Sequence, residues 1–132
     1  MRARNGYNPP RMDGQHRFVL SQEVRVEARI VAIVGEFDAG GLSEAEPLLM
    51  AASADPERAL VIDLTECEFL DSTAIALIVG AARPLINGQI KVAIAAKRDS
   101  EVAQILELAG IDKTIPVLPT AKLALEKALE IE

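Results

Sequence analysis

The residues best placed to do chemistry form the triplet Asp71-Ser72-Thr73, which lies directly before a run of apolar residues at helical spacing. A hydroxyl at the start of a helix is exposed on a rigid element, and the free backbone N–H groups there tolerate a phosphate. Ser72 is therefore a candidate phosphorylation site, with Thr73 as the second choice. The competing interpretation is that Ser72 or Thr73 only caps the helix, a role worth about 1 kcal/mol.

Few other residues supply the groups that catalysis or metal binding needs. The chain has one cysteine, Cys67, and one histidine, His16, so neither a cysteine-rich metal site nor an internal disulfide is predicted. No nucleophile with its base is recognisable either. We therefore predict a protein that binds a partner, is not an enzyme and needs no cofactor. Cys67 is expected to be a buried small apolar residue and not a redox thiol.

The elements on either side of the triplet predict its position in the fold. Residues 59–64 form a near-continuous apolar run, which is typical of a strand covered on both faces in a parallel sheet. A helix is predicted from the triplet onward, and Pro84 is expected to end or kink it early. The apolar stripe of this helix consists of Ile75, Ile78, Val79, Ala82, Leu85 and Ile86.

The rest of the chain predicts an α/β domain. Alternating residues between Val24 and Phe37 predict two short strands that meet near Ala28 and Arg29. The next helix has the spacing of a capping box at Ser43 and Glu46. Later elements are a strand over 89–95, a helix over 102–109 stopped by Gly110, a short strand over 115–118 and a last helix capped by Thr120. We predict a single domain with a small mixed sheet of four to five strands, packed by about four helices.

Composition limits the partners and the compartment. The net charge is −6 although residues 1–17 are basic, so the body of the chain is strongly acidic and nucleic acid is not an expected partner. No apolar run approaches the roughly 20 residues that span a bilayer, so membrane insertion is not expected. We predict a cytoplasmic protein with a flexible, dispensable tail at 1–16 and a domain at 17–132.

Three segments resemble the STAS family. The stretch 60–79, LVIDLTECEFLDSTAIALIV, resembles the family's central strand, loop and helix, with its Phe-hydrophobic-Asp-Ser-Ser/Thr-Gly turn. The tetrapeptide Gly35-Glu36-Phe37-Asp38 is similar to the family's Gly-Glu-Leu-Asp, and residues 105–111 are similar to its Leu-x-x-x-Gly-Leu segment. Together these segments cover roughly residues 20–130 in the family's order.

This resemblance implies an anti-sigma factor antagonist. In such proteins the serine that corresponds to Ser72 is phosphorylated by the partner, an anti-sigma factor that is a histidine-kinase-like serine kinase. The unphosphorylated form binds this kinase and frees a sigma factor, and a phosphatase is a further implied partner. The resemblance also places Asp38 and Asp71 together beside the helix start, where they line the kinase contact. The alternative is that Asp71 is a cap and Asp38 a turn residue.

One face of the helix after the triplet is a candidate docking surface. Thr73, Ala76, Gly80 and Arg83 lie opposite the buried stripe and form a small-residue face on which a partner helix fits. Alternatively, they only fill an exposed helix. Ala74 belongs to the predicted partner site but replaces the family's glycine, which narrows a partner's approach. Two rival functions stay open: a STAS subunit of a lipid or anion transporter, and a small-ligand-binding regulator with a cleft near Asp38 and Asp71.

Overall fold

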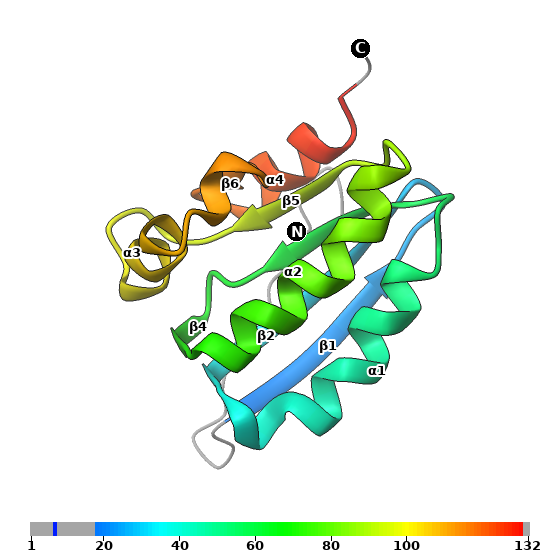
Figure 1. Ribbon diagram of the computed structural model, residues 1–132. Helices are drawn as coiled ribbons and strands as arrows, with labels where there is room; N and C mark the ends of the chain where they lie inside the picture. The colour runs from blue at the N-terminus through cyan, green and yellow to red at the C-terminus, as the bar shows by residue number, and fades with distance from the viewer. Residues whose placement is uncertain (1–6, 8–17, 131–132) are drawn as a thin grey trace.

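The computed structural model describes residue 7 and residues 18–130, which form a mixed sheet with helices on both faces (Figure 1). The described strands are β1 (Phe18–Val24), β2 (Ala28–Phe37), β3 (Ala59–Asp63), β4 (Cys67–Leu70), β5 (Val92–Ala95) and β6 (Val117–Leu118). The helices are α1 (Leu42–Ser53), α2 (Ser72–Asn87), α3 (Glu101–Leu108) and α4 (Ala121–Ala128), with 3₁₀ turns η1 (Ala39–Gly41) and η2 (Ile111–Lys113). The predicted α/β class is confirmed, with six described strands where four to five were expected.

The strand order explains how distant segments meet. The sheet runs β1-β2-β3-β5-β6; β1 is antiparallel to β2, and the other pairings are parallel. β3 pairs with residues 28–32 of β2, and β4 pairs with residues 35–37 of the same strand. β4 therefore continues the line of β3 beside the second half of β2. The register shifts by one residue between Gly35 and Glu36 of β2, because Glu68 of β4 is left without a partner in β2. Gly35 has the positive φ of 94° that suits glycine.

The predicted hairpin exists, but its turn lies earlier than expected. β1 and β2 pair from Phe18 opposite Gly35 to Val24 opposite Arg29, so the turn comprises residues 25–27. Val26 is 85% exposed at this turn. The rings of Phe18 and Phe37 lie 5.7 Å apart, which anchors the beginning of β1 to the end of β2.

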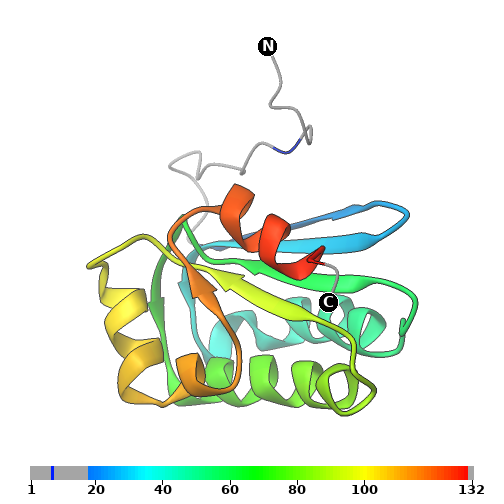
Figure 2. The same ribbon diagram turned by 90° about the horizontal axis from the view of Figure 1, so that it is seen from above.

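Two cores hold the helices to the sheet. The larger core joins α1, α2 and α3 to one face through β2, β3 and β5, and the second joins α4 to the opposite face. Figure 2 shows this layering, with α4 on one side of the sheet and α1 and α2 on the other. We call the face under α1 and α2 the first face and the face under α4 the second face.

Two expectations about helix ends are wrong. The helix α1 has Gly41 as its N-cap with no side-chain hydrogen bond, so Ser43 and Glu46 do not form a capping box. The preceding turn η1 already delivers the chain to α1, and Asp38 caps that turn instead. The helix α2 passes through Pro84 and ends at Asn87. Pro84 itself is exposed, whereas its neighbours Ala81, Ala82 and Leu85 are buried, so packing on the sheet outweighs the lost backbone bond.

Other expectations are confirmed. Gly110 adopts the left-handed conformation after α3, with φ of 76°, and Thr120 caps α4 by accepting from the N–H of Leu123. Cys67 is only 7% exposed, and burial raises its pKa to about 11.

The N-terminal segment departs from the expected free tail at one residue. Tyr7 packs against the second-face core, and its hydroxyl donates to Oδ2 of Asp63. The remainder of the predicted flexible tail, residues 1–6 and 8–16, lies outside the described residues.

Candidate partner-binding site

The site is built where two neighbouring parallel strands end. In the register of β2 and β4, Phe37 lies opposite Leu70, so the next residues, Asp38 and Asp71, leave the same edge of the sheet side by side. The N–H of Asp71 donates to the carbonyl of Phe37 at 3.3 Å, which fixes this juxtaposition.

Asp71 connects the two loops that meet there. Its Oδ1 accepts from the N–H of Ala74 at 2.9 Å and from the Thr73 hydroxyl at 2.6 Å, which makes it the N-cap of α2. Its Oδ2 accepts from the N–H of Ala39 at 3.1 Å, in the loop after β2. The Thr73 hydroxyl first, and then the Ala74 N–H, hold the pKa of Asp71 below its usual value. The carboxylate is therefore ionised at neutral pH and rigidly held.

Asp38 has a related local role. Its Oδ1 accepts from the N–H of Gly40 at 2.9 Å, so it caps η1 just before α1 begins. Each aspartate is thus a cap or turn residue, and the two lie together beside the start of α2. Contact of either with a partner stays a prediction.

The two hydroxyls of the triplet differ in their contacts. The Thr73 hydroxyl donates a hydrogen bond to Oδ1 of Asp71. The Ser72 side chain is exposed at the first helical position, and its hydroxyl has no hydrogen-bond partner among residues 7 and 18–130. Neither residue is the helix cap, because Asp71 is. Of the two candidate hydroxyls, that of Ser72 can be approached from solvent without breaking an internal hydrogen bond.

The predicted docking face of α2 is exposed, with one exception. Thr73, Ala76, Gly80 and Arg83 are all solvent-exposed along the helix, on the side away from the sheet. A Cβ at Gly80 would have no heavy atom within 4 Å, so this position is open surface. Ala74 is fully buried in the first-face core, so its side chain cannot face a partner, and Ala74 is removed from the surface set.

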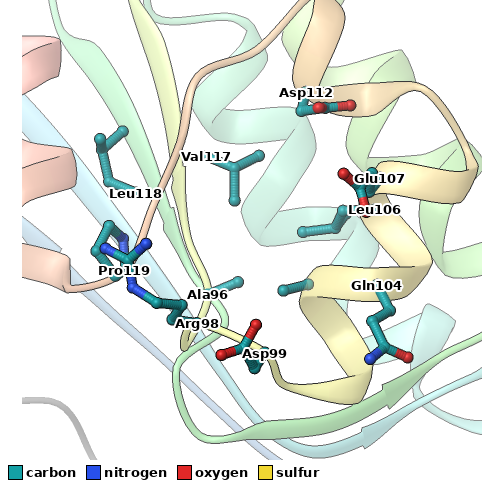
Figure 3. A pocket seen from close by; sticks show the side chains of 11 residues that line it. Ala96, Arg98, Asp99, Gln104, Leu106, Glu107, Asp112, Val117, Leu118 and Pro119 are labelled. Carbon is teal, nitrogen blue, oxygen red and sulfur yellow. The ribbon is translucent and has the colours of Figure 1, made fainter.

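Hollows near the site differ from the predicted cleft. The hollow beside Asp38 is small, about 180 Å³, and is lined by Phe18, Glu36, Asp38, Gly40 and Gly41, without Asp71. A hollow of about 320 Å³ lies instead between α3 and the ends of β5 and β6. Figure 3 shows Gln104 and Glu107 of α3 on one side of it and Arg98 and Pro119 on the other. No local sequence pattern indicated this hollow, because it forms only when α3 and β6 come together in the tertiary structure.

The described part of the chain contains neither a metal site nor a membrane-spanning helix. Among residues 7 and 18–130, no three His, Cys, Asp or Glu side chains are grouped so that they could hold a metal ion. None of the helices in that part has the length and apolar character needed to cross a membrane.

Comparison with known families places this geometry in context. The STAS domain family model matches residues 20–124. No curated protein matches the chain significantly.

Several solved structures share the fold. An anti-sigma factor antagonist from Mycobacterium paratuberculosis is 27% identical, with a TM-score of 0.77 over 86% of this chain and 95% of that one. A STAS-domain anti-sigma factor antagonist from Planctomyces limnophilus is 20% identical, with a TM-score of 0.68 over 83% and 96% of the two chains. The phosphorylated form of the Bacillus cell fate determinant SpoIIAA is 17% identical, with a TM-score of 0.61 over 83% and 97%.

Proposed function

Because the chain belongs to the STAS domain family, we propose that it is an anti-sigma factor antagonist whose α2 binds an anti-sigma factor kinase and whose Ser72 that kinase phosphorylates. The observation that carries the proposal is the free, exposed hydroxyl of Ser72 beside the ionised, rigidly held Asp71. The solved structure that is 27% identical to this chain is that of an anti-sigma factor antagonist. SpoIIAA, which has this fold, has been solved in an unphosphorylated and a phosphorylated form.

The surface around Ser72 suits close contact with a partner. Ala76 and Gly80 have small or no side chains, so a partner can come close to the exposed face of α2. Arg83 supplies a cation near the other end of this face. Asp38 and Asp71 border the helix start, where a partner that reaches Ser72 must also approach. Binding through this face, in the cytoplasm where ATP is available to the kinase, accounts for these features without requiring catalysis by this chain.

Phosphorylation at this position changes binding more than folding. A phosphoserine carries about −1.5 to −2 charges. At the start of α2 the helix dipole favours that charge by about 0.3 to 1 kcal/mol, so the domain stays folded. At a desolvated interface beside the Asp71 carboxylate, burying an unpaired dianion costs several kcal/mol, on the order of what a specific complex gains. The modified protein therefore releases the kinase, which then binds its sigma factor.

The test measures modification and affinity on the same proteins. After incubation with the cognate kinase and ATP, mass spectrometry should place phosphate on Ser72. In calorimetric titrations, Ser72→Ala should bind the kinase constitutively, and Ser72→Glu should lose at least about tenfold in affinity, which is roughly 1.4 kcal/mol. Phosphate found only at other residues would contradict the switch.

Ser53 provides a matched control. It lies at the last position of α1, and Figure 1 places the end of α1 at the opposite end of the helical layer from the start of α2. Ser53→Glu adds the same charge and should leave the affinity unchanged. Equal affinities for Ser72→Ala and Ser72→Glu, or recovery of a transporter ATPase as the partner in a pull-down, would favour the transporter subunit instead.

A further inference from the structure

Asp63 is a buried carboxylate on the second face of the sheet, away from α1 and α2. It is the last residue of β3 and is 2% exposed, and among the described residues it is the only buried one with a charged side chain. Its Oδ1 accepts from the N–H of Thr65 at 3.0 Å and from the Thr65 hydroxyl at 2.6 Å. These bonds leave Oδ2 in need of a donor, because burying a carboxylate without hydrogen bonds costs several kcal/mol.

That donor comes from the beginning of the chain. The Tyr7 hydroxyl donates to Oδ2 of Asp63 across 56 positions of sequence. The Tyr7 ring packs against the second-face core, which is built mainly from alanines together with Ile30, Val61 and Leu125. Because alanine side chains are small, they leave room on this face of the sheet both for α4 and for an aromatic ring that packs against the same core. Shape and hydrogen bonding thus select the same group, a ring that carries a hydroxyl.

We propose that the second face carries a binding site for a tyrosine side chain, with Asp63 as the acceptor, and that the occupant of this site is Tyr7 of the same chain. Phenylalanine fits the same apolar surface but leaves the carboxylate without its donor. A phosphorylated or ionised tyrosine places negative charge against Asp63 and is excluded. The site lies across the sheet from Ser72, so it does not depend on the proposed function.

The ionisation of the Tyr7 hydroxyl should show whether Tyr7 occupies this site. Burial first, and then the hydrogen bond and the charge of Asp63, raise the pKa of Tyr7, and the carboxylate of Glu23 on β1 acts in the same direction. Tyr7 is the only tyrosine in the chain, and there is no tryptophan. Near-ultraviolet absorbance and fluorescence therefore report on Tyr7 without interference.

The first experiment uses the full chain at neutral pH. We expect acrylamide to quench Tyr7 fluorescence several-fold less in the folded chain than in a synthetic peptide of residues 1–16. Equal quenching in the two would overturn the proposal. Protection that falls on dilution, together with a dimeric mass, would also overturn it, because Tyr7 would then be seated in a second copy.

The second experiment tests Asp63 as the acceptor. In the full chain the absorbance of tyrosinate should rise with a midpoint at least one pH unit above that of the peptide, which should titrate near about pH 10. Asp63→Asn keeps the size of the side chain and removes its charge, so the midpoint should move down toward the peptide value while circular dichroism shows an intact fold. A midpoint that does not change in this variant contradicts the role of Asp63. The quenching comparison needs no variant and stays decisive if Asp63→Asn does not fold.

Discussion

At the scale of the residue, the site depends on one carboxylate that serves two loops. Asp71 caps α2 with Oδ1 and holds the loop after β2 with Oδ2. Because both oxygens are engaged, Asp71 fixes the start of α2 relative to the loop that follows Asp38. A partner that recognises this edge meets a preorganised surface and loses little entropy in ordering it.

Replacing Asp71 should separate its two roles. Asp71→Asn keeps a capping acceptor and should lower the melting temperature slightly, whereas Asp71→Ala removes the cap and the link to Ala39 and should lower it more. The pH dependence has a defined sign, because the pKa of Asp71 is lowered in the folded state. Its stabilising contribution is present above the unfolded-state value of about 3.9 and is lost as pH falls through the folded value.

Thermal melts across acidic pH check this prediction. The difference between wild type and Asp71→Ala should be largest at neutral pH and should shrink as the solution becomes more acidic than about pH 4. A difference that is independent of pH over that range would show that the ionised carboxylate contributes nothing to stability.

Sequence predicts the members of this cluster better than their individual roles. The adjacency of Asp38 and Asp71 was expected from the family resemblance, and it is observed. Which hydroxyl stays free was not predictable, because the answer depends on the Thr73 hydroxyl turning toward Asp71. The burial of Ala74 follows from the phase of α2 against the sheet, which the triplet alone does not determine.

Among the elements, α2 continues through Pro84 to Asn87 without a break in the helix. Its stripe of Ile78, Ala81, Ala82 and Leu85 is buried against the sheet, so burial holds the last turn of the helix in place. The docking face therefore extends from Thr73 to Arg83 without interruption.

Gly80→Ala should separate folding from binding on this face. The added methyl meets no neighbour, and alanine is favoured over glycine within a helix by about 1 kcal/mol, so the free energy of unfolding should rise by up to that amount. Kinase affinity should fall, because the methyl obstructs close approach. Denaturant unfolding and calorimetry give the two quantities.

A larger substitution sharpens the same test. Ala76→Arg should abolish binding while leaving the fold intact, and Ala54→Arg, at an exposed position just after α1, should leave binding unchanged. Unaltered affinity for both Gly80→Ala and Ala76→Arg would mean that these residues only fill an exposed helix.

Strand β4 was missed in the sequence for a physical reason. It has four residues, two of them exposed, and its pairing partner is the distant end of β2. So short a segment has no periodicity of its own and becomes a strand only through that non-local pairing. The run Ala59–Asp63, in contrast, is buried along most of its length, and its apolar sequence predicts this directly.

At the scale of the whole molecule, the sheet separates two sites that use opposite faces. Ser72 and the exposed side of α2 belong to the layer on the first face, and Tyr7 and Asp63 belong to the second. The sequence did not predict the docking of Tyr7, because a lone tyrosine in a polar, arginine-containing segment has no periodic signal.

The rate at which a reagent labels the buried thiol of Cys67 can measure how often β4 separates from the sheet. Cys67 opens β4, the strand that delivers Asp71 to the site, and its Sγ lies 3.3 Å from the carbonyl of Phe69. A reagent in solution reaches this sulfur only during excursions in which β4 leaves β2, so the labelling rate counts those excursions. Labelling of the native chain should be slower than that of the denatured chain by tenfold for each roughly 1.4 kcal/mol that opening costs. Bound kinase should slow it further, and equal rates for native and denatured chains would mean that β4 does not protect the site.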